Sequence, residues 1–163
     1  MRFSLILGLA AALVTPLAAA AYDDPKSLVA AIYQPYQAGQ QHADLNQFYS
    51  TRLKQLFLAH AETAAAEVDT TAAEPLSIAP AIDFNPFIDA QHALILDVAV
   101  GEPVVVGEQA LVTVGFHNFD QPTLLSLSLV KEPDGWKVDD VTSMGGEENW
   151  MLSWLLLYDP WGM

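Results

Sequence analysis

Between residues 92 and 142, apolar side chains recur at every second position, which is the period of a β-strand and not of a helix. Short turn sequences at residues 106–108 and 133–135 divide this region into consecutive segments. Since short turns join neighbouring antiparallel strands, the pattern predicts an antiparallel meander sheet. The expected strands run over residues 94–100, 112–116, 124–131 and 136–142.

Two helical patterns precede the strands. Asp24 stands before Pro25, so a capping carboxylate is followed by a proline at the first helical position, and apolar residues then recur at helical spacing as far as Tyr36. Ser50 caps a second helix, whose apolar face begins at Leu53. The sequence therefore predicts an α+β fold in which N-terminal helices pack on a curved, cone-like antiparallel meander sheet, with a short C-terminal helix.

Residues 1–20 have the pattern of a cleavable secretory signal, with a positive start at Arg2, an apolar run over residues 3–17 and small alanines after it. A transmembrane anchor is the alternative, but the run is shorter than the roughly 20 residues needed to span a bilayer, and Pro16 interrupts it. We expect a periplasmic or secreted protein in which residues 21–163 form one domain, with no stable membrane anchor after cleavage.

The expected mature domain is strongly acidic. Removing the signal leaves 5 of the 6 basic residues and all 20 acidic ones, so the net charge is 5 − 20 = −15. Such a surface disfavours nucleic acids and anionic membranes as partners. There is no cysteine, so a hydrophobic core and not disulfides must hold the fold.

No metal and no cofactor are expected. The four histidines lack the spacing of a zinc site, and Asp83, Asp89 and Asp97 are spaced unlike a calcium loop, so a solvated surface is the favoured interpretation for these acids. His60, on an apolar helix face, is interpreted as a hydrogen-bonded core residue. No nucleophile elbow or phosphate-binding glycine loop is present.

Four short strings, taken in their order and spacing, resemble a known family. They occupy residues 48–53, 83–91, 114–118 and 135–141, and include Phe48-Tyr49-Ser50, Asp83-Phe84-Asn85-Pro86-Phe87 and Gly135-Trp136-Lys137-Val138-Asp139-Asp140-Val141. Over about residues 27–157 the chain resembles the nuclear transport factor 2-like superfamily and, within it, the exported bacterial family called domain of unknown function 3828. The resemblance implies a cone-shaped α+β fold and export. It implies no reaction, because one fold carries many functions.

Asp140 is the first candidate site residue. Strand alternation places it on the same inward face as Trp136 and Val138, where a carboxylate must be paired or neutralised. Arg52 is the best placed cation, so an internal Arg52–Asp140 ion pair is the favoured interpretation. The alternative is an enzyme in which Asp140 acts as general base in a dry pocket, with Arg52 or Tyr49 stabilising developing negative charge.

The C-terminal region is strongly apolar and predicts a helix over about residues 149–158. Its aromatic residues form a stripe at helical spacing, for which core packing is favoured over a binding surface. The opposite face is rich in leucine, so we expect one face to pack on the sheet and the other to meet a second copy, as in a homodimer, or another protein. The stripe consists of Trp150, Trp154, Tyr158 and Trp161.

These patterns favour an exported non-enzymatic module that binds a small apolar ligand or a protein partner through the cone mouth and the aromatic tail. The excess of apolar residues in the tail over what a small core needs is the reason for this hypothesis. The enzyme with Asp140 as general base remains the alternative. The binding candidates are Arg52, Asp140, Tyr49, His117, Trp150 and Trp154.

Overall fold

The computed structural model describes residues 21–67, 82–145 and 149–158, so the predicted signal segment lies outside the described residues. The α+β class and the placement of the helices predicted from the sequence are confirmed, whereas β2 was not predicted as a separate strand. The helices are α1 (Pro25–Gln37), α2 (Thr51–Glu67) and α3 (Leu152–Tyr158), with a 3₁₀ turn at Asn46–Phe48. The strands are β1 (Ile95–Val100), β2 (Val104–Val106), β3 (Gln109–Asn118), β4 (Gln121–Glu132) and β5 (Gly135–Ser143).

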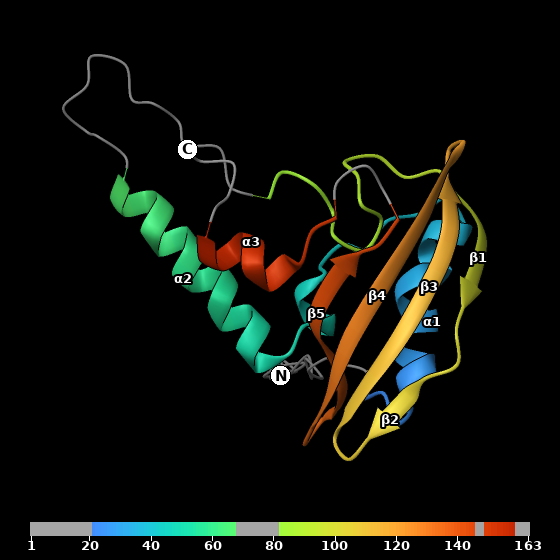
Figure 1. Cartoon of the computed structure of the whole chain (residues 1–163), viewed down its shortest axis with the longest axis horizontal. Coiled ribbons are helices and arrows are strands. Elements are labelled where there is room, and N and C mark those ends of the chain that lie inside the picture. Colours follow the sequence, from blue (N-terminus) through green and yellow to red (C-terminus); the bar gives the residue numbers. More distant parts are fainter. Residues whose placement is uncertain (1–20, 68–81, 146–148, 159–163) are drawn as a thin grey trace, which may run out of the picture.

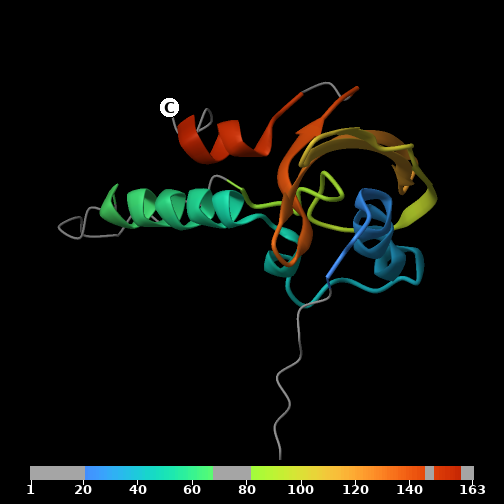
Figure 2. The same cartoon turned by 90° about the horizontal axis from the view of Figure 1, so that it is seen from below.

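All paired strands of the five-stranded sheet run antiparallel, in the order β1-β3-β4-β5, and β2 pairs with β3 on the same edge as β1. Figure 2 shows that the sheet arches over α1. We call the side that faces α1 the inner face and the opposite side the outer face. Val112 and Leu127, opposite each other on β3 and β4, are fully buried on the inner face. Their neighbours Leu111 and Ser128 therefore point to the outer face.

Helix α1 fills the inner side of the arch. Asp24 caps it as predicted, since its Oδ2 accepts a hydrogen bond from the backbone N–H of Ser27 at 2.8 Å. Leu28, Val29 and Ile32 of this helix are fully buried. The apolar face of α1 thus supplies one side of the core, and the inner face of the sheet supplies the other.

Aromatic residues complete this core. Phe87 is fully buried and lies against the rings of Phe48 and Tyr49, at centroid separations of 6.2 and 5.6 Å. The hydroxyl of Tyr33 donates to the carbonyl oxygen of Phe87 at 2.8 Å, and Asn85 accepts from the backbone N–H of Phe87 at 2.9 Å. These side chains therefore fill the inner side of the arch, and the exposed apolar side chains described below lie outside it.

A β-bulge in β5 overturns one prediction. Leu129 lies opposite Val138 and Ser128 lies opposite Asp140, so Asp139 is an extra residue without a partner on β4. The bulge reverses the alternation beyond it. The prediction that Asp140 shares the inner face with Trp136 and Val138 is therefore wrong: Asp140 lies on the outer side, opposite the outward-pointing Ser128.

Helices α2 and α3 leave the sheet from its β5 edge and lie side by side (Figure 1). Tyr49 forms a parallel bridge with Val138 just before α2, and Met151 forms an antiparallel bridge with Thr142 just before α3. Ser50 caps α2 as predicted, since its hydroxyl accepts from the backbone N–H of Leu53 at 3.0 Å. Segments distant in sequence thus cover the edge of β5.

The buried tyrosines should make the protein sensitive to alkali. Burial raises the pKa of Tyr33, Tyr36 and Tyr49 above the ordinary value of 10.0. Below pH 10 both states keep these protons, so the stabilising contribution is fully present; above it, the unfolded chain loses them first, and the free energy of unfolding falls as pH rises toward the folded-state pKa values. Urea unfolding measured from about pH 8 to about pH 11 should show this fall.

Tyr49→Phe should flatten this alkaline slope, because the substitution removes one of the three phenols while keeping the ring. The ultraviolet absorbance of phenolate gives an independent measurement. If all three tyrosines ionised reversibly near pH 10 in the folded protein, the assignment of these side chains to the core would be contradicted.

Candidate functional site

A groove runs across the outer face of the sheet from β2 to β5. Its floor is one row of directly opposed residues: Val104 faces Leu111, Leu111 faces Ser128, and Ser128 faces Asp140. The row crosses the sheet at right angles to the strands, with apolar side chains at the β2 end and polar ones at the β5 end. Strand register alone brings these residues together.

A second row forms one side of the groove. Val106 faces Gln109 on β3, and Gln109 faces Val130 on β4. The groove has a volume of about 430 Å³, which lies within the range of small-molecule sites. Val104, Val106 and Leu111 are 64%, 74% and 44% exposed, so large apolar side chains here face solvent. The β2 end is therefore an apolar surface without a cover among the described residues.

Arg52 and Asp139 form the opposite, polar end of the groove. The Nε atom of Arg52 lies 3.0 and 2.9 Å from the two carboxylate oxygens of Asp139, and Nη2 donates to the Asp139 backbone oxygen at 2.6 Å. The predicted Arg52–Asp140 ion pair is therefore wrong, because the bulge turns the preceding carboxylate, and not Asp140, toward α2. The pair is also partly open to solvent, with the two side chains 49% and 27% exposed.

Asp140 instead holds the start of α3. Its Oδ1 accepts from the backbone N–H groups of Val141 and Ser153, at 2.9 and 3.0 Å, and its Oδ2 accepts from the Ser153 hydroxyl. The first N–H groups of a helix have no partner within it, and an acidic side chain satisfies them well. Asp140 is 9% exposed. Its carboxylate thus has a structural use at the groove's polar end.

Two other candidates do not meet at this site. Tyr49 is 4% exposed and its ring is stacked between Phe57 and Phe87, so it belongs to the core. His117 lies on the outer face near the other end of β3, where its Nδ1 is 3.6 Å from the Asp97 carboxylate. Of the six predicted binding residues, only Arg52 and Asp140 line this groove. Trp150 and Trp154 line a separate, shallower hollow of about 290 Å³ beside Thr142 and Met151.

The aromatic residues of the C-terminal tail do not lie on one face as the predicted stripe does. Trp150 precedes α3 and is buried, and its Nε1 donates to Asp89 at 2.7 Å. Trp154 and Tyr158 are 49% and 66% exposed, so the expectation that the stripe is core packing is wrong for these two residues. Leu155 and neighbouring residues form the buried side of α3 instead. Trp161 lies outside the described residues, and coverage of the exposed side by a second copy or another protein stays a prediction.

Asp89 has a structural role that the sequence did not indicate. It has a left-handed backbone with φ of 51°, and its Oδ2 accepts from the Ser143 hydroxyl at 2.7 Å while Oδ1 accepts from Trp150. The interpretation of Asp89 as solvated surface is therefore wrong: it joins the end of β5 to the segment that enters α3. No local pattern signals a contact between residues so far apart.

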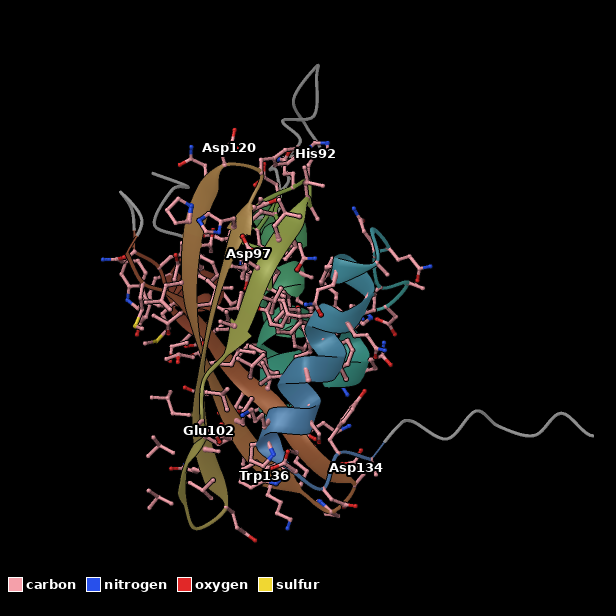
Figure 3. The ribbon with its side chains drawn as sticks, turned by 90° about the vertical axis from the view of Figure 1, so that its right-hand side faces the viewer. His92, Asp97, Glu102, Asp120, Asp134 and Trp136 are labelled. Carbon is pink, nitrogen blue, oxygen red and sulfur yellow. The ribbon has the colours of Figure 1, made fainter. Side chains whose placement is uncertain are left out.

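Two lysines of the described residues form ion pairs away from the groove. Lys26 pairs with Glu102, and the nearly buried Lys137 pairs with Asp134 at 3.1 Å. The hydrogen bond from Lys137 lowers the pKa of Asp134. Figure 3 shows Asp120 and Asp134 at opposite ends of the sheet. In residues 21–67, 82–145 and 149–158, no three His, Asp or Glu side chains are placed to hold a metal ion.

Comparisons with known proteins give no match to a protein-family model, a curated protein or a solved structure. The resemblance to the nuclear transport factor 2-like superfamily thus stays a prediction. Within the part of the chain that the structure describes, no helix combines the length and apolar character needed to cross a membrane.

The groove residues were missed for identifiable reasons. Residues 104–106 are three consecutive valines directly before Gly107 and Glu108, which is a usable strand signal, although a strand of three residues is short. Asp139 was overlooked as the partner of Arg52. The consecutive acids Asp139 and Asp140, in a strand that otherwise alternates, are the one local sign of the bulge.

The two carboxylate contacts predict unequal effects on stability. Asp140→Ala leaves the backbone N–H of Ser153 without its acceptor in a buried position, so we expect a loss of about 1–3 kcal/mol. Arg52→Ala removes a partly exposed ion pair, so its loss should stay below about 1 kcal/mol. Urea unfolding measures both, with Asp23→Ala at an exposed position as control. Equal losses for Asp140→Ala and Arg52→Ala would contradict these assignments.

Proposed function

We propose that this chain is an exported, non-enzymatic module that binds a small apolar ligand in the groove on the outer face of its sheet. The observation that carries the proposal is the groove itself, about 430 Å³ in volume, with exposed valine and leucine side chains at one end and an ion pair at the other. Concave sites with apolar walls and a few convergent polar groups are typical of small-molecule binding. Export rests on the sequence pattern of residues 1–20.

The site proposed here differs from the cone mouth expected from the sequence. The inner side of the arch is occupied by α1 and by fully buried rings such as Phe87. The outer face carries the exposed apolar residues of the groove. Membership of the nuclear transport factor 2-like superfamily is part of the proposal, and the order of two helices followed by a curved antiparallel sheet supports it.

The arrangement of Asp140 favours binding over catalysis. A general base needs a carboxylate within hydrogen-bond reach of a substrate proton, whereas both oxygens of Asp140 accept hydrogen bonds from Val141 or Ser153. Every buried side-chain nitrogen and oxygen of the described residues likewise has a partner. The enzyme hypothesis therefore lacks the reactive group on which it was based.

A matched pair of leucine substitutions tests the groove. Leu111 lies on its floor, and Leu124 lies on the outer face of β4 outside it, with nearly equal exposures of 44% and 43%. Leu111→Gln should weaken the binding of an environment-sensitive apolar dye by about tenfold, because it puts an amide where the dye buries apolar surface. Leu124→Gln should leave binding unchanged. Fluorescence titration measures both.

Two results would contradict the proposal. One is that the unmodified protein does not bind the dye or any apolar compound at millimolar concentration. The other is that Leu111→Gln and Leu124→Gln lower dye binding equally, which would show adsorption to exposed apolar surface in general. Thermal unfolding of both variants provides the control for folding, and exposed positions on a sheet face should change stability little.

A further inference from the structure

The polar end of the groove indicates which head group the ligand carries. We propose that the ligand is an uncharged molecule with an apolar chain and a terminal carbonyl group, such as an amide or ester, and that this carbonyl accepts hydrogen bonds from Arg52. The inference rests on the proposed function, because it assigns the chemistry of a molecule bound in the same groove. Arg52 is then the residue that determines head-group specificity.

Arg52 has hydrogen-bond donors that its contact with Asp139 does not use. A guanidinium carries five N–H groups in a fixed planar arrangement. Nε and Nη2 are engaged by Asp139, whereas Nη1 donates to none of the described residues. The side chain lines the groove and is 49% exposed, so its remaining N–H groups are open to a ligand. A carbonyl oxygen is the matching acceptor.

The local charge disfavours an anionic head group. The groove is lined by one cation, Arg52, and by two carboxylates, Asp139 and Asp140, so its net charge is 1 − 2 = −1. The whole chain has a formal net charge of −14. A carboxylate would therefore enter against repulsion from nearby acids. Its desolvation at the partly covered end of the groove would add to that cost.

A cationic head group is disfavoured by the geometry of the ion pair. Asp139 is already hydrogen-bonded to Arg52 and to the hydroxyl of Ser50, the latter at 2.6 Å. The Asp140 oxygens are engaged by Val141 and Ser153. What the groove offers is the unengaged side of the guanidinium, which repels an ammonium group. A neutral acceptor is repelled neither by the carboxylates nor by the guanidinium.

The dimensions suit a chain lying across the strands. Neighbouring strands are about 4.8 Å apart, so the distance from β2 to β5 is about 14 Å. With its head at Arg52, the apolar chain would run along this path over Leu111 toward Val104 and Val106. The exposed valines of β2 would lose solvent contact, which supplies the apolar part of the binding free energy.

Three compounds with one chain and different heads test this inference: octanamide, octanoate and octylammonium, which at pH 7 are neutral, anionic and cationic. Displacement of the apolar dye gives the dissociation constant of each. Octanamide should bind about tenfold more tightly than either charged compound, because it gains a hydrogen bond from a charged donor without bringing a charge to the site.

Substitutions at two cations of α2 supply the matched controls. Arg52→Met removes the donors and should weaken octanamide about tenfold, while octylammonium should bind more tightly because the repelling guanidinium is gone. Lys54→Met, on the same helix but outside the groove lining, should change none of the three constants. The head-group preference of the unmodified protein does not depend on whether Arg52→Met folds, which thermal unfolding checks separately.

The outcomes separate this inference from the proposed function. If the three compounds bind with equal affinity, or if octanoate or octylammonium binds most tightly, the carbonyl head group is overturned and the groove remains a ligand site. If Arg52→Met leaves a preference for octanamide intact while folded, Arg52 is not the residue that recognises the head. If neither the dye nor any of the three compounds binds, the proposed function itself is wrong.

Discussion

One extra residue in β5 determines where both outlying helices lie. The bulge turns two consecutive carboxylates toward different neighbours. Asp139 holds the first turn of α2 through Ser50 and Arg52. Asp140 holds the first turn of α3 through Ser153. In regular alternation Asp140 would point into the apolar inner face, where an unpaired carboxylate costs several kcal/mol. The bulge therefore avoids the burial of an unpaired Asp140 carboxylate, and both Asp139 and Asp140 attach a helix to the same edge of the sheet.

Local signals in the sequence predicted local structure well. The caps at Asp24 and Ser50 were predicted correctly because a capping hydrogen bond joins residues two or three apart and needs no other segment. The face of Asp140 was predicted wrongly because alternation assumes a strict two-residue period, which a bulge breaks. A second bulge, between Leu96 and Ala99, interrupts the alternation of β1 in the same way.

The groove could not be predicted because it depends on long-range register. Its floor follows from three strand pairings, which place residues of β2, β3, β4 and β5 in one row. The structure of the C-terminal tail likewise depends on contacts with residues distant in sequence. Trp150 fits the helical spacing of the stripe, but its hydrogen bond to Asp89 and the bridge at Met151 hold this segment extended, so α3 begins only at Leu152. Periodicity indicates which residues are apolar, not which partner each one finds.

The sheet discourages strand pairing at its edges but leaves its outer face open. Tyr49 and Met151 cover the β5 edge by pairing with it. β2 has only three residues and lies between Glu102 and Glu108, and short edge strands with flanking charges resist pairing with another strand. A molecule lying across the strands meets no such obstacle, because the groove offers apolar side chains and ends at Arg52. Covering those side chains would stabilise the fold through mass action, in proportion to the logarithm of ligand concentration once the site is saturated. The physical features that oppose an added strand thus favour a small ligand on the face.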